Sequence, residues 1–149
     1  MNNLKEVKPF DQGVALFSTT AAFTICFAVW TIFAIIGVQI KQDMGLTDTQ
    51  FSLLIGTPIL TGSLIRLFLG IWADQYGGRP ILLAVMLSSS LCTWLLSYAD
   101  TYNMLILAAL GVGISGGSFV VGITYLSKWY SKEKQGTSLG IFGMGNIGA

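Results

Sequence analysis

Long uncharged apolar stretches, separated by short polar segments, dominate the amino-acid sequence. Each is at least as long as the ~20 helical residues needed to cross the ~30 Å hydrocarbon core of a bilayer. None shows the alternation that is typical of a membrane β-barrel strand, so helices are the expected spanning form. The pattern predicts an all-α membrane protein with four complete transmembrane helices, which lie within residues 12–40, 49–73, 80–99 and 101–127.

A last apolar stretch, residues 136–149, predicts the start of a fifth transmembrane helix. Its 14 residues are fewer than a full span requires, so we expect the chain to be truncated inside this helix. Six Lys and Arg residues fall in the amino terminus, the second–third loop and the fourth–fifth loop, against Lys41 on the opposite side. Because cytoplasmic loops are enriched in Lys and Arg, we expect residues 1–11 to be cytoplasmic and the protein to be a multi-pass component of the plasma membrane.

The composition excludes several classes of function. Only 10% of the residues are charged and the net charge is +1, which gives no basic surface for nucleic acid. The sequence has no histidine, and Cys26 and Cys92 lie inside apolar stretches, so we expect no metal site and no enzymatic activity. Two stretches satisfy G-x-G-x-x-G, but neither follows a strand, so no dinucleotide cofactor is predicted.

Arg66 is the one charged residue inside the predicted second helix, about 12 Å from Asp74 at the helical rise. Gly62, Ser63 and Gly70 share its helix face, which favours the bundle interior. An intramembrane charge usually serves function, and a guanidinium suits planar oxyanions, so a small anionic substrate is the hypothesis. The alternative is an arginine that extends to the cytoplasmic headgroups.

Two further residues of the predicted fourth and fifth helices reach a similar depth. Phe119 lies about 14 Å from Lys128, and Asn146 lies about 18 Å from Lys134. Transporter binding sites occur near the bilayer midplane. By itself, however, the aromatic ring is equally compatible with lipid or core packing, and the amide with a hydrogen bond between helices.

The segment that closes the second helix has a specific spacing. Gly70-x-x-x-Asp74-x-x-Gly77-Gly78-Arg79 resembles the loop motif of the major facilitator superfamily, with Gln75 where that motif usually has Arg or Lys. Residues 140–149 resemble the glycine-rich signature of the nitrate/nitrite porter family within that superfamily, and residues 116–119 are similar to its fourth helix. The resemblance extends over nearly the whole chain from the first predicted helix onward.

The resemblance implies twelve helices in two halves, with one substrate site between them, so that this chain would supply most of the amino-terminal half. Arg66 would hold the oxygens of nitrate or nitrite, Phe119 would pack against the planar anion, and Asn146 would complete this side of the site. The glycines of the fifth helix would pack near the site, namely Gly143, Gly145 and Gly148. The loop motif would belong to gating through four residues, namely Gly70, Asp74, Gly77 and Arg79.

These features lead us to expect alternating-access transport of nitrate and nitrite, with the bilayer and a carboxy-terminal half as partners. Two alternatives to this function are transport of another small anion and a role as a membrane sensor that does not transport. No carboxylate lies inside the predicted helices, so this part of the protein offers no side-chain proton relay. That favours anion exchange over proton symport.

Overall fold

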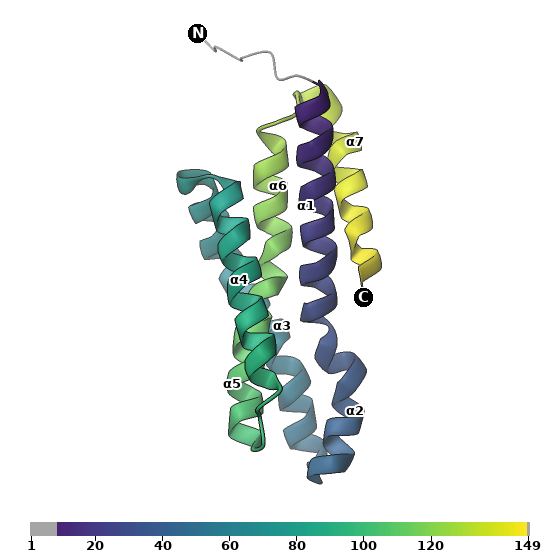
Figure 1. Cartoon of the computed structure of the whole chain (residues 1–149), viewed down its shortest axis with the longest axis vertical. Coiled ribbons are helices and arrows are strands. Elements are labelled where there is room, and N and C mark those ends of the chain that lie inside the picture. The colour runs from purple at the N-terminus through teal and green to yellow at the C-terminus, as the bar shows by residue number, and fades with distance from the viewer. Residues whose placement is uncertain (1–8, 149) are drawn as a thin grey trace.

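The computed structural model describes residues 9–148, which form a bundle of helices with no strand in that range (Figure 1). The helices follow one another along the chain as α1 (Pro9–Trp30), α2 (Ile32–Met44), α3 (Asp48–Tyr76), α4 (Gly78–Leu96), α5 (Tyr102–Gly113), η1 (Ile114–Gly117), α6 (Ser118–Ser127), α7 (Lys132–Gly143) and η2 (Met144–Gly148). The two η elements are short 3₁₀ helices.

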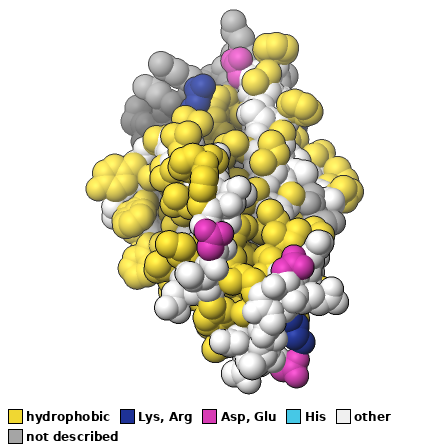
Figure 2. Space-filling view, turned by 60° about the horizontal axis from the view of Figure 1, so that its bottom comes forward, with side chains coloured by type: hydrophobic (Ala, Val, Ile, Leu, Met, Phe, Trp, Pro, Cys, Tyr) yellow, Lys and Arg dark blue, Asp and Glu magenta, His cyan; other side chains and the backbone are white. Residues whose placement is uncertain are grey.

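Four segments are long and apolar enough to cross a membrane. They are Phe10–Met44, Asp48–Tyr76, Gly78–Leu96 and Tyr102–Ser127. Many large apolar side chains on these segments are exposed, and Figure 2 shows a face on which hydrophobic groups predominate and charged groups are few. A surface of this kind needs lipid or another protein against it. The prediction of an all-α membrane fold is therefore confirmed.

The helix bounds differ in detail from the predicted ranges. The most visible difference is at the fifth apolar stretch, where α7 begins at Lys132 and not near Gly136. Ser131 is extended there, with φ −63° and ψ 155°, and its carbonyl oxygen accepts hydrogen bonds from the backbone N–H groups of Lys134 and Gln135. The polar residues before Gly136 form the first turn of the helix, which a search for apolar residues does not detect.

Two of the membrane-length segments are interrupted in the middle. The first changes from α1 to α2 at Thr31, whose Oγ1 donates to the carbonyl oxygens of Phe27 and Ala28 at 3.1 and 3.2 Å. The fourth passes from α5 through η1 to α6. The second 3₁₀ helix, η2, directly follows α7. Short 3₁₀ stretches within helices often mark hinges or functional sites. Both 3₁₀ helices contribute a residue to the cavity described below, Gly116 from η1 and Asn146 from η2.

The connections alternate between the two ends of the bundle. Figure 1 shows the start of α1, the α3–α4 connection and the α6–α7 connection at one end, and the α2–α3 and α4–α5 connections at the other. The α3–α4 connection is a single residue, Gly77, with φ +94°, a conformation that glycine adopts readily. Arg79 and Lys128 lie near the first end and Lys41 near the second, whereas Lys5 and Lys8 lie outside the described residues.

Candidate functional site

A small cavity lies where α1, α3, α6 and the two 3₁₀ helices meet. Its volume is about 190 Å³, and it is lined by Phe23, Phe27, Arg66, Gly116, Phe119 and Asn146. The structure therefore brings together the three residues that the sequence nominated as substrate ligands. Because a water molecule occupies about 30 Å³ in the liquid, the cavity has room for a small polyatomic ion.

Larger hollows exist elsewhere. One measures about 610 Å³, runs between α1, α4 and α6, and is lined mostly by apolar side chains, with Asp11 and Arg79 among its polar ones. None of Arg66, Phe119 and Asn146 is among the residues that line it. The chemistry of the lining, and not the volume, identifies the smaller cavity as the candidate site, since binding sites combine an apolar lining with a few placed polar groups.

Arg66 points across the bundle from α3. Its Nε donates a hydrogen bond to the carbonyl oxygen of Gly116 in η1 at 3.0 Å, and its Cζ lies 5.5 Å from the ring centroid of Trp30 in α1. These partners lie on neighbouring helices rather than at the end of α3. The guanidinium therefore contacts η1 and α1 in the interior of the bundle.

Within the described part of the chain, the charge of Arg66 has no carboxylate beside it. Among residues 9–148, the ion pairs are Lys41–Asp48 and Lys128–Asp74, and neither involves Arg66. A carbonyl dipole and an aromatic face stabilise a cation without neutralising it. The part of the site that residues 9–148 form therefore carries a net positive charge, which an anion could balance.

Aromatic rings form much of the cavity wall. Phe119 lies 5.4 Å from Phe23 and 5.8 Å from Phe142, measured between ring centroids, and it is stacked on the latter. Phe23 also contacts Phe142 at 4.8 Å. In this cluster, defined here as the Phe23–Phe119–Phe142 cluster, Phe23 and Phe119 form an apolar wall of the cavity, and Phe142 packs behind them. Electrostatic interactions are stronger beside an apolar wall than in water.

The glycines of the carboxy-terminal segment differ in their surroundings. A side chain at Gly145 would place its Cβ 2.5 Å from Cδ1 of Phe23, so glycine is required for η2 to approach α1 and bring Asn146 to the cavity. Gly143 differs from the prediction, because within the described part of the chain no neighbour lies within 4 Å of its Cβ position. Open space therefore lies beside Gly143, whereas the preceding residue, Phe142, is buried.

The residues of the loop motif do not line the cavity, and some of them instead contact α6. Gly70 packs against α6, where a Cβ would lie 3.0 Å from Val120 Cγ1, and Gly78 packs against Tyr125. The Asp74 carboxylate pairs with Lys128 at 3.2 Å, and Lys128 Nζ also donates to the Asp74 carbonyl oxygen. The motif thus ties the end of α3 to the end of α6, while Arg79 is exposed beside the large groove.

The α6–α7 connection is fixed at the same end of the bundle. Tyr130 donates its hydroxyl to the carbonyl oxygen of Gln12 at 2.8 Å, and Gln12 Nε2 donates to the carbonyl oxygen of Trp129 at 2.9 Å. Burial raises the pKa of the Tyr130 phenol, so the hydroxyl keeps its proton and its donor role. These bonds connect the start of α1 to the start of α7.

Three aromatic residues of the site were missed by the sequence analysis, namely Phe23, Phe27 and Trp30. Their spacing of four and three residues places them on one face of α1, and this was the available signal. In an apolar helix, however, a stripe of this kind equally describes a lipid-facing surface. Only the packing of η1 and η2 against α1 separates the two possibilities.

The fold and the cavity define a multi-pass helical membrane protein with a cationic site between its helices. Residues 19–149 match the Major Facilitator Superfamily, and the chain belongs to that superfamily. It is 43% identical over 146 residues to a "Probable nitrate/nitrite antiporter NarK1" from Thermus thermophilus, covering 98% of this chain and 33% of the relative.

Two other relatives have related names. The chain is 36% identical over 140 residues to a "Probable nitrate/nitrite transporter NarK2" from Mycobacterium tuberculosis, covering 92% of this chain and 35% of the relative. It is 34% identical over 136 residues to a "Probable nitrate transporter NarT" from Staphylococcus carnosus, covering 91% and 35%. The resemblance to nitrate/nitrite porters is confirmed, and the chain spans about a third of the length of the curated relatives it matches.

Proposed function

We propose that this chain forms part of a nitrate/nitrite transporter of the plasma membrane that works by alternating access. The observation that carries the proposal is the Arg66 cavity, a cationic site among helices of membrane length with no carboxylate partner among residues 9–148. The names of its relatives support nitrate and nitrite as the anions. The start of α1 would face the cytoplasm.

In this proposal, the cavity lining performs substrate recognition. Arg66 donates charge-assisted hydrogen bonds to the oxygens of the anion, because the guanidinium fork matches a planar oxyanion. The Phe119 ring packs against the flat face of the ion, and the Asn146 amide contributes a donor from the other side. A carboxy-terminal half would supply the facing residues.

The end of the bundle at α3, α4 and α6 would act as the gate. The Asp74–Lys128 pair holds α3 to α6 in this conformation. In the alternating-access cycle, the loop motif would engage the other half of the transporter in one state and release it in the other. An exposed pair of this kind contributes little to stability and is easily exchanged for another partner.

Exchange of nitrate for nitrite is the transport mode that these residues favour. The predicted spans contain no carboxylate, and the sequence contains no histidine that could relay a proton. The anion itself would therefore recharge the site in each half-cycle. In such an exchanger, an empty cavity with an unbalanced guanidinium would disfavour the return step.

Counterflow into liposomes tests the proposal. We expect the full-length transporter, reconstituted into vesicles loaded with nitrite, to take up external nitrate, and to do so faster than in vesicles without an internal anion. Uptake that follows an imposed pH gradient and ignores internal nitrite would contradict exchange. Stronger inhibition by formate or phosphate than by nitrite would favour another anion, and nitrate binding without counterflow would favour a sensor.

A further inference from the structure

We propose that Trp30 is a positioning residue of the anion site, which holds the Arg66 guanidinium against η1 by its aromatic face and leaves the charge free to bind substrate. This inference rests on the proposed function. It assigns a role to a residue of α1 that does not line the cavity itself but contacts Phe27, which does, with ring centroids 5.5 Å apart.

The guanidinium is held at two points. The Gly116 carbonyl oxygen accepts the hydrogen bond from Nε, and the Trp30 ring covers Cζ at 5.5 Å. A single hydrogen bond from Nε leaves the group able to rotate about that bond. The ring restricts this rotation, so the fork stays directed at the cavity.

The Trp30 ring is itself fixed by α3. Its Nε1 donates a hydrogen bond to the carbonyl oxygen of Pro58 at 3.1 Å. Two glycines make room for the indole from opposite helices, since a Cβ at Gly62 or at Gly116 would lie 2.9 Å from Nε1. An indole cannot bend away from such a contact, so these glycines are required for the ring to occupy its place.

Trp30 is a neutral residue, and this matters for anion binding at Arg66. A carboxylate at this position would hold Arg66 as firmly but would compete with an incoming anion for the same charge. An aromatic face attracts a cation, most strongly when the pair is shielded from water, and tryptophan is the best such residue. The ring therefore orients the guanidinium without occupying its hydrogen-bonding groups.

Calorimetric titration of the full-length transporter with sodium nitrate tests the inference. Trp30→Leu removes the aromatic face, and we expect the Kd for nitrate to rise about tenfold. Trp30→Phe keeps a face but loses the N–H group, and we expect about a threefold rise. Trp94→Leu on α4 is the matched control, since that ring is 58% exposed and lies outside the site; its Kd should match wild type.

A second pair of variants moves the ring without changing it. Gly62→Ala places a methyl group 2.9 Å from Nε1 of Trp30 and 3.0 Å from the Gly113 carbonyl oxygen, so the ring must shift, and we expect the Kd to rise about threefold. Gly56→Ala on the same helix meets no neighbour within 4 Å in the described structure and should leave the Kd unchanged.

The outcomes separate positioning from a structural role. If Trp30 only stabilised the fold, Trp30→Leu would lower the number of binding sites in the sample and leave the Kd of the remainder at the wild-type value. That result, or an unchanged Kd in both Trp30→Leu and Gly62→Ala, would overturn the inference while the proposed function stands. Absence of nitrate binding by the wild-type protein would overturn both.

Discussion

Arg66 and Lys41 are two cations with similar aromatic neighbours and different polar ones. The Arg66 guanidinium lies over the Trp30 ring, and Lys41 Nζ lies 5.2 Å from the ring centroid of Phe51. Lys41, however, also pairs with the Asp48 carboxylate at 2.5 Å, whereas the polar partner that residues 9–148 give Arg66 is a backbone carbonyl. The presence of the carboxylate decides what each charge can do.

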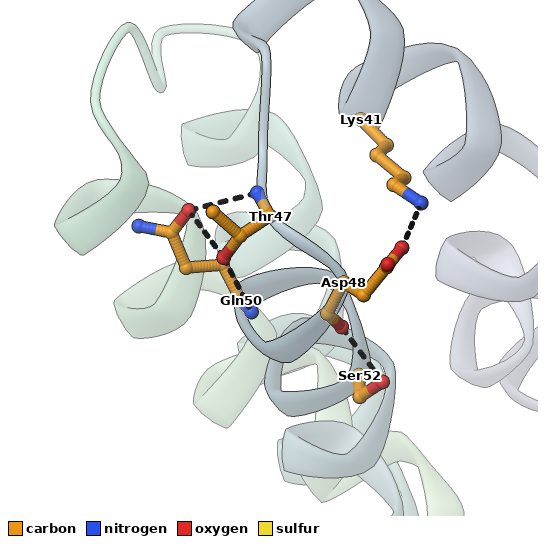
Figure 3. Close-up of polar contacts among 5 residues, drawn as sticks. All are labelled: Lys41, Thr47, Asp48, Gln50 and Ser52. Carbon is orange, nitrogen blue, oxygen red and sulfur yellow. Dashed lines mark hydrogen bonds and ion pairs between the residues drawn. The ribbon is translucent and has the colours of Figure 1, made fainter.

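The surroundings of Lys41 form a closed polar cluster at the α2–α3 connection (Figure 3). Thr47 and Gln50 make a reciprocal capping box, and Ser52 donates to the carbonyl oxygen of Asp48. Each of the five residues drawn there makes at least one contact within the cluster, which secures the start of α3. Arg66, by contrast, is held in place but not neutralised, which is the condition for binding an exchangeable anion.

The largest predicted effect comes from giving Arg66 the kind of partner that Lys41 has. Asn146→Asp places a carboxylate in the same cavity, and we expect nitrate affinity to fall at least about 100-fold, since the new charge pairs with the guanidinium and repels the anion. Titration calorimetry on the full-length transporter measures this. Asn146→Ser is the control, because it shortens the polar group without adding charge, and its Kd should rise far less.

A loss of less than tenfold in the Asn146→Asp variant would contradict the geometry of the cavity. It would mean that residue 146 and Arg66 do not act on the same ion. Arg66 and Lys41 would then differ only in how deeply their side chains are buried.

A smaller effect is expected where η2 approaches α1. Gly145→Ala would place a methyl group 2.5 Å from the Phe23 ring, and overpacking of this kind costs about 1–3 kcal/mol. We expect a lower thermal unfolding midpoint in detergent and a several-fold higher Kd for nitrate. Gly143→Ala on the preceding helix meets no neighbour within 4 Å in the described residues and should change neither quantity. Equal effects of the two variants would contradict the predicted packing.

The smallest effect is expected at the closed pair. Lys41→Gln removes the ion pair with Asp48, whose side chain is 94% exposed. Exposed pairs are well solvated and contribute little, so the unfolding midpoint should change by no more than about 2 °C. Nitrate transport should be unaffected. A loss of transport comparable to that of an Arg66 variant would show that the comparison between the two cations is mistaken.

The sequence was most informative where charge and hydropathy conflict. Arg66 was evident because a cation inside an apolar stretch has few explanations, and helical rise placed Phe119 and Asn146 at comparable depths. Depth does not specify direction. That the three side chains line one cavity depends on the rotation of each helix, which follows from packing at positions such as Gly145.

Other features could not be anticipated from the pattern of apolar residues. The interruption at Thr31 leaves hydropathy unchanged, because the residues on both sides are apolar. Trp30 looked like any other aromatic residue of a membrane helix until its contacts with Pro58 and Arg66 were known. Gly143 and Gly145 look alike in the sequence, yet only the latter packs against α1.

The binding of nitrate to an Arg66→Lys variant tests the central claim most directly. Lysine keeps the positive charge but loses the planar fork, the Nε hydrogen bond to Gly116 and the stacking on Trp30. We predict that titration of the full-length, folded transporter will show a Kd for nitrate at least about tenfold above wild type. A Kd equal to that of the wild-type protein would contradict the account, because it would show that the guanidinium does not hold the anion.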